Sequence, residues 1–130
     1  MTGLIIDDAW LDALAAATGD LPERPGATAT MGFTVSGLPE VVSFVVEMVD
    51  GAVTAVTAVE RPGDEVDFVF LLGADRLTDV LAGDNTLEVG YMRGEIKVTG
   101  DIGRMLSVLP VTTSPQWRTA LASVAPEPTA

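Results

Sequence analysis

The dipeptide Asp50-Gly51 limits the fold of this chain more than any other feature, because it lies between two strand-like stretches. VVSFVVEMV (41–49) precedes it, and AVTAVTAVE (52–60) follows it. Valine and threonine are enriched in strands. Asp-Gly is a preferred sequence for the two-residue type I′ turn, which needs positive φ at both residues. The pattern therefore predicts an antiparallel hairpin.

The first strand of this hairpin has one polar and one apolar face. Ser43 and Glu47 fall on the polar side, and we expect Glu47 to face solvent. The residues that alternate with them are all apolar: Val42, Phe44, Val46 and Met48. Because alternate residues of a strand point to opposite faces, this apolar side should be covered by other elements.

Three further stretches have the composition and bounding turns of strands: MGFTVSG (31–37), VDFVFLLG (66–73) and EIKVTG (95–100). In the second of these stretches, Asp67 alternates with a run of large apolar residues: Phe68, Phe70 and Leu72. We expect the three apolar residues to face the helices and Asp67 to point the other way.

Helical periodicity appears before and after the strands. The spacing of apolar residues predicts helices over about 7–18, 74–83 and 115–124, and another that begins at Ile102 and ends at Pro110. Asp7 or Asp8, Asp101 and Ser114 are candidate N-caps of three of them. TLEVGYM (86–92) is ambiguous, since a glycine interrupts it. The order of helix, four antiparallel-type strands, helix, strand and helices predicts one α+β domain over residues 1–130.

Composition limits the kinds of partner. The chain has 7 basic and 19 acidic residues, for a net charge of −12, which disfavours nucleic acid and anionic lipid surfaces. No apolar run approaches the roughly 18 residues that span a bilayer, so we expect no stable membrane insertion. The N-terminal MTGLIIDDAW lacks the pattern of a signal peptide, and cysteine is absent. We therefore expect a cytoplasmic protein.

The residue types of this chain support few kinds of catalysis. Histidine is absent, which excludes a Ser-His-Asp triad and a histidine metal site. No glycine-rich phosphate loop is present. Carboxylates and Tyr91 are the only candidates for acid–base work. We assign no catalytic residue, no metal ligand and no cofactor, which favours a protein without enzymatic activity.

Four segments, in order, resemble the sterol carrier protein type-2 family of lipid-binding domains. They are VVSFVVEMVDGAVTAV (41–56), EVDFVFLLGADRLTDVLAG (65–83), YMRGEIKVTGD (91–101) and IGRMLSVL (102–109). The third looks like the signature of the family, with a hydrophobic pair, a glycine and a strand that closes on Gly-Asp. The resemblance covers about residues 30–110.

The resemblance implies a single five-stranded, mostly antiparallel sheet that helices cover on one side, with an apolar tunnel between the two layers. Members of the family bind sterols, fatty acids or acyl-CoA esters there without covalent chemistry. On this basis the candidate ligand-binding residues are Phe44, Val46, Met48, Phe68, Phe70, Leu72, Leu77, Leu81, Tyr91, Met92, Ile102, Met105, Leu106, Leu109, Trp117 and Leu121.

Three functions remain open at this point. The first is non-catalytic binding or transfer of a hydrophobic small molecule, with affinity from buried apolar surface. The second is a cofactor-free cyclase or isomerase that acts on a hydrophobic metabolite, with a buried Asp, Glu or Tyr91 as acid or base. The third is a dimerisation or scaffold domain, in which the apolar stripe of the last helix packs on a second subunit to form a homodimer. If the first holds, we expect that helix to act as a lid, with Trp117 near the entrance.

Overall fold

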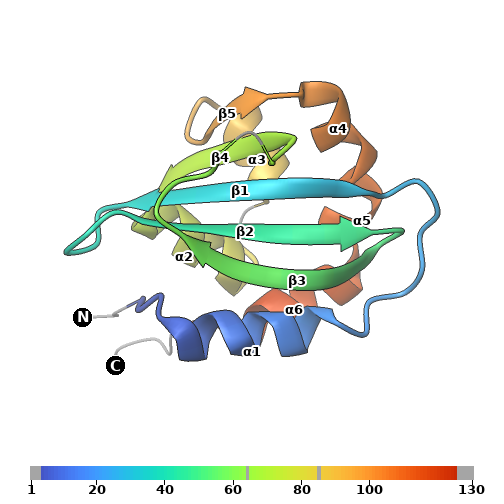
Figure 1. Ribbon diagram of the computed structural model, residues 1–130, viewed down its shortest axis with the longest axis horizontal. Coiled ribbons are helices and arrows are strands. Elements are labelled where there is room, and N and C mark those ends of the chain that lie inside the picture. The colour runs from blue at the N-terminus through green and yellow to red at the C-terminus, as the bar shows by residue number, and fades with distance from the viewer. Residues whose placement is uncertain (1–3, 64, 85, 126–130) are drawn as a thin grey trace.

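The structure, a computed structural model, describes residues 4–63, 65–84 and 86–125; the remaining residues of the expected 1–130 domain lie outside this description. Its strands form one five-stranded sheet in the order β3-β2-β1-β4-β5 (Figure 1). Their bounds are β1 Ala29–Ser36, β2 Val42–Val49, β3 Ala52–Val59, β4 Phe68–Gly73 and β5 Lys97–Gly100. The α+β class with a single sheet is confirmed.

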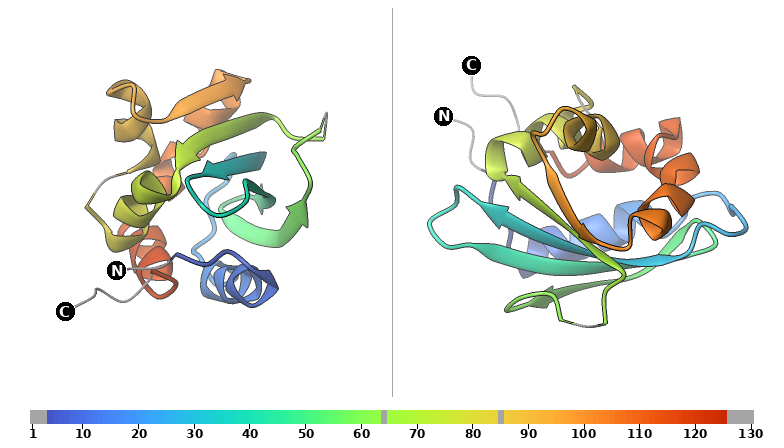
Figure 2. Two further views of the ribbon diagram at one scale, coloured as in Figure 1. Left: turned by 90° about the vertical axis from the view of Figure 1, so that its left-hand side faces the viewer. Right: turned by 90° about the horizontal axis from the view of Figure 1, so that it is seen from above.

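The helices lie on one side of this sheet, as Figure 2 shows in its right-hand view. They are α1 Asp8–Thr18, α2 Ala74–Ala82, α3 Leu87–Met92, α4 Ile102–Ser107, α5 Leu109–Thr112 and α6 Pro115–Ala122. α1 packs along β3 and against α6, and α6 in turn packs against α2. Within the described residues, no helix is both long enough and apolar enough to span a bilayer.

The predicted hairpin is confirmed, with β2 and β3 antiparallel and joined by Asp50 and Gly51. Their φ angles of 48° and 91° are both positive, as a type I′ turn requires. A side chain at Gly51 is also excluded by space, because a Cβ there would lie 2.8 Å from the backbone of Pro22 and Arg24. Glu47 is exposed on the outer face of the sheet, as expected.

The strand directions correct one expectation. The first four strands were expected to be of the antiparallel type, but β1 and β4 run parallel, with Phe33 beside Phe70. The chain between β3 and β4 crosses the outer face of the sheet and returns on the far side of β1. Pro62 in this crossing packs over Gly32, where a Cβ would lie 3.0 Å from the proline ring. The other three pairings are antiparallel, so the sheet is mostly antiparallel.

The predicted helix caps are confirmed. The side chains of Asp7, Asp101 and Ser114 each accept a hydrogen bond from a backbone N–H in the first turn of α1, α4 and α6. Pro110 does not end the helix that starts at Ile102, because α4 already stops at Ser107 and the proline lies in the first turn of α5.

The ambiguous segment TLEVGYM contains α3. Thr86 caps it through a hydrogen bond from the N–H of Val89, at 3.2 Å. Gly90 fits inside this helix because a Cβ there would lie 2.5 Å from the side chain of Ile96, which is buried just before β5. The glycine therefore lets α3 approach the start of the last strand.

A row of aromatic rings runs across the inner face of the sheet. Phe33 stacks on Phe44 with ring centroids 4.9 Å apart, and Phe70 follows on the other side of Phe33 at 5.1 Å. Phe68 and Phe70 are 1% and 0% exposed, which confirms the predicted register of β4. Just before β4, the carboxylate of Asp67 accepts a hydrogen bond from the N–H of Thr30 in β1 at 2.8 Å.

Candidate ligand-binding pocket

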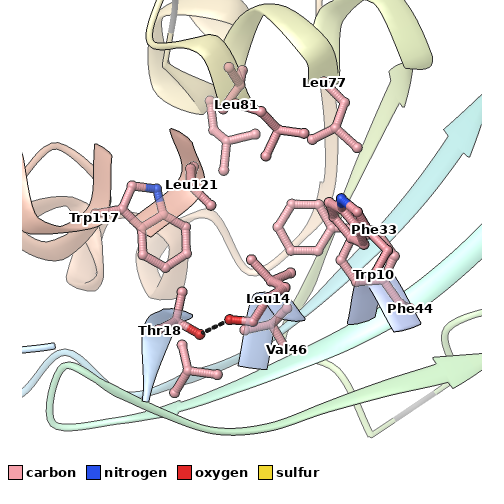
Figure 3. A pocket seen from close by; sticks show the side chains of 13 residues that line it. Trp10, Leu14, Thr18, Phe33, Phe44, Val46, Leu77, Leu81, Trp117 and Leu121 are labelled. Carbon is pink, nitrogen blue, oxygen red and sulfur yellow. Dashed lines mark hydrogen bonds between the residues drawn. The ribbon is translucent and has the colours of Figure 1, made fainter. Parts of the chain in front are cut away.

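One pocket lies between the sheet and three of the helices, α1, α2 and α6 (Figure 3). Its floor comes from β1, β2 and β3, and α3 adds one side chain. The lining residues are Trp10, Leu14, Thr18, Phe33, Phe44, Val46, Val53, Leu77, Val80, Leu81, Leu87, Trp117 and Leu121.

The lining is largely apolar, and its hydroxyl group, that of Thr18, already has a hydrogen-bond partner. The Oγ1 of Thr18 donates to the carbonyl oxygen of Leu14, one turn earlier in α1, at 2.7 Å. The indole N–H of Trp10 donates to the carbonyl oxygen of Val124 at 2.9 Å. No charged side chain is among the described residues that line the pocket. Such a surface attracts a ligand by burial of apolar area rather than by charge.

The pocket is closed in this structure. The space inside it is about 20 Å³, which is room for one sphere the size of a water molecule. Sites that hold drug-sized molecules are commonly about 300–1,000 Å³. A lipid can therefore enter only if the helices move away from the sheet or from one another.

Trp10 marks the place where the pocket comes nearest to the surface. Among the described lining residues it is the one that is part-exposed, whereas the other twelve are buried. Its ring also meets Phe44 edge-on, with centroids 5.7 Å apart. Its hydrogen bond to Val124 joins α1 to the chain just after α6. Trp117, which was expected near the entrance, is 4% exposed and lies inside.

The structure brings six of the sixteen predicted ligand-binding residues together in this pocket. They are Phe44, Val46, Leu77, Leu81, Trp117 and Leu121. Five others are buried in the adjoining core without lining the pocket: Met48, Phe68, Phe70, Leu72 and Met105. The other three are part-buried: Tyr91 and Ile102, which pack against that core, and Leu109.

Met92 and Leu106 lie at the surface, with 82% and 53% of their area exposed. Both belong to helices of six residues, each of which turns a narrow side to the core. In α4 that side carries Met105, so the next residue, about 100° further round the helix, points outward. The wall of the pocket opposite the sheet comes from α1, α2 and α6 instead of α4.

Seven lining residues were not among the predicted site residues: Trp10, Leu14, Thr18, Phe33, Val53, Val80 and Leu87. The sequence predicted a helix over about 7–18, but its pattern did not indicate where on the sheet that helix packs. That position follows from the packing of α1 on β3 and α6.

Among the described residues, no group of three or more His, Cys, Asp or Glu side chains could bind a metal ion.

Comparisons with known proteins give matches in structure only. No protein-family model matches the sequence, and no curated protein matches it. Among solved structures, a conserved hypothetical protein from Thermus thermophilus, described as "possibly sterol carrier protein", is similar with a TM-score of 0.76 and 22% identity. The match covers 99% of this chain and 96% of that one.

Two other solved structures are similar over most of this chain. Sterol carrier protein 2 matches with a TM-score of 0.68 and 20% identity, over 91% of this chain and 95% of that one. The sec-alkylsulfatase Pisa1 from Pseudomonas sp. matches with a TM-score of 0.60 and 18% identity, over 85% of this chain but 17% of that one. The order of the elements, the five-stranded sheet and these matches together show that this protein has the fold of sterol carrier protein 2.

Proposed function

We propose that this protein binds a hydrophobic small molecule, such as a sterol, a fatty acid or another acyl chain, and carries it without covalent chemistry. The observation that supports this most is the lining of the pocket, where aliphatic and aromatic side chains predominate and the described residues include no charged side chain. The likeness in fold to sterol carrier protein 2 supports the same class of ligand.

Burial of apolar surface supplies enough free energy for such binding. Each buried methylene contributes about 0.8 kcal/mol, so a chain of about ten methylenes gains about 8 kcal/mol before the costs of association. Ligand entry has to enlarge the closed pocket, and the seam between α1 and α6 at Trp10 is where it does so. In this account α6 is the lid.

The pocket supports carriage over catalysis, because a cyclase or isomerase needs an acid or a base beside its substrate. Among the described lining residues there is no carboxylate and no tyrosine. The apolar stripe of α6 also gives no reason to invoke a second subunit. Trp117, Ala120 and Leu121 of α6, and Val124 just after it, are all buried against the rest of the same chain.

A pair of matched variants tests the proposal. Leu121→Trp puts a larger ring into the pocket, and Leu106→Trp makes the same change on the exposed side of α4. Titration with a fluorescent fatty acid should show at least about a tenfold loss of affinity for Leu121→Trp, which is about 1.4 kcal/mol. Leu106→Trp should stay within about twofold of wild type.

Equal affinities for the two variants would show that the ligand does not occupy this pocket. Because overpacking also destabilises a core, urea denaturation of both variants checks that each is folded under the conditions of the titration. Wild-type protein that fails to bind fatty acids, fatty alcohols and sterols alike would contradict the proposed function itself.

A further inference from the structure

Glu88, on α3, is a buried carboxyl group with one oxygen unpartnered. The residue is only 9% exposed. Its Oε1 accepts a hydrogen bond from the hydroxyl of Thr112 on α5. Its Oε2 is fully covered and has no hydrogen-bond partner among the described residues, where it is the one buried side-chain oxygen or nitrogen in this condition.

An acceptor of this kind is costly to leave unpaired. A buried polar group without a partner costs about 1–3 kcal/mol, and more if it is charged. Buried polar groups in native proteins are almost always satisfied by protein, ordered water or ligand. The Oε2 of Glu88 is therefore a place where a partner from outside the chain gains a hydrogen bond that the fold itself does not supply.

This carboxyl group is connected to two walls of the pocket through neighbouring residues. Leu87, the residue before it in α3, lines the pocket. Thr112 belongs to α5, which packs on α6, the helix that contributes Trp117 and Leu121 to the lining. Neither Glu88 nor Thr112 lines the pocket in its closed form. A lipid needs far more than the enclosed 20 Å³, so the pocket has to enlarge, and Glu88 is the residue next to Leu87 of its α3 wall.

We infer that Glu88 and Thr112 hold the polar end of the ligand, and that this end is a hydroxyl group. The inference rests on the proposed function and narrows it to a hydrophobic alcohol. A hydroxyl group can donate to the Oε2, and this is the hydrogen bond that the fold does not supply. The carboxylate of a fatty acid has no hydrogen to donate, so it cannot supply the bond that the Oε2 lacks as an acceptor.

The test compares a long-chain fatty alcohol with the fatty acid of the same chain length, each displacing a fluorescent lipid from the full-length protein. The wild type should bind the alcohol at least about tenfold more tightly than the acid. Glu88→Gln keeps the shape and the acceptor for Thr112 but places an amide nitrogen at the site of Oε2. In this variant the preference for the alcohol should fall to within about threefold.

Glu47→Gln is the matched control, since it removes one negative charge from the exposed outer face of the sheet. It should keep the wild-type preference. Wild-type protein that binds the acid as tightly as the alcohol overturns the inference, and this result needs no variant to fold. If Glu88→Gln leaves the preference for the alcohol unchanged, the inference is also overturned. The partner of the Oε2 would then be a buried water. If the protein binds neither the alcohol nor the acid, the proposed function itself is contradicted. That result is distinct from the two results that overturn the inference.

Discussion

Replacing Trp10 by phenylalanine should speed ligand uptake, because it removes the hydrogen bond that closes the seam between α1 and α6. The indole N–H donates to Val124 across 2.9 Å, and phenylalanine has no such donor. The smaller ring can still meet Phe44, which now lies edge-on to the indole at 5.7 Å. The change therefore affects the seam more than the aromatic row.

The size of the effect follows from that single bond. A neutral intramolecular hydrogen bond contributes about 1 kcal/mol, which is a factor of about five in an equilibrium. If the open seam is the competent state, its population and the association rate should both rise about fivefold in Trp10→Phe. Stopped-flow mixing with a fluorescent lipid measures this rate directly. Trp117 then remains as the single tryptophan, inside the pocket, and reports on the bound ligand.

Ser43→Ala is the control for a general loss of stability. The hydroxyl of Ser43 pairs with that of Thr34 at 3.1 Å, and β2 turns this residue away from the pocket-lining Phe44 and Val46. Its loss should lower the free energy of unfolding by about 1 kcal/mol and leave the rate of uptake unchanged. An uptake rate in Trp10→Phe that equals wild type, or that Ser43→Ala raises equally, would refute the reasoning about the seam.

Two more predictions concern charge and the lid. The affinity for a fluorescent fatty acid should be the same at about 0.05 and 0.5 M salt, because apolar burial dominates; a steep loss with salt in a titration would point instead to the exposed cations Arg93, Lys97 and Arg104. Deletion of residues 114–130 removes α6 with Trp117 and Leu121, and it should weaken binding markedly while far-UV circular dichroism still reports a folded sheet; a truncated protein that binds as tightly as the full chain would contradict the role of α6 as lid.

Features with a local cause were predictable from the sequence. The turn at Asp50-Gly51, the caps Asp7, Asp101 and Ser114, and the register of β4 each depend on a few neighbouring residues. The parallel pairing of β1 with β4 was not predictable in this way, because it depends on the path of the chain across the outer face of the sheet. The residues of β1 and β4 do not by themselves indicate which strand lies beside them in the sheet.

The pocket was predictable only in part for a similar reason. The alternating residues of β2 gave Phe44 and Val46, and the stripes of α2 and α6 gave Leu77, Leu81, Trp117 and Leu121. Which helices face each other over the sheet is a matter of tertiary packing, so the contribution of α1 was missed. For the same reason Leu106 was wrongly predicted to line the pocket. In the structure α4 turns Met105 to the core and leaves Leu106 exposed.

The central claim, that a hydrophobic molecule lies between the sheet and α1, α2 and α6, is tested most directly by methyl NMR of the full-length protein. Increasing amounts of a long-chain alcohol or fatty acid would be added to protein with labelled leucine, isoleucine and methionine methyl groups. The account predicts that the methyl signals of Leu14, Leu77, Leu81 and Leu121 shift and saturate together, while those of exposed Ile5, Met92 and Leu106 stay in place. Shifts centred on Ile102, Leu106 and Leu109, with the four pocket leucines unmoved, would contradict it.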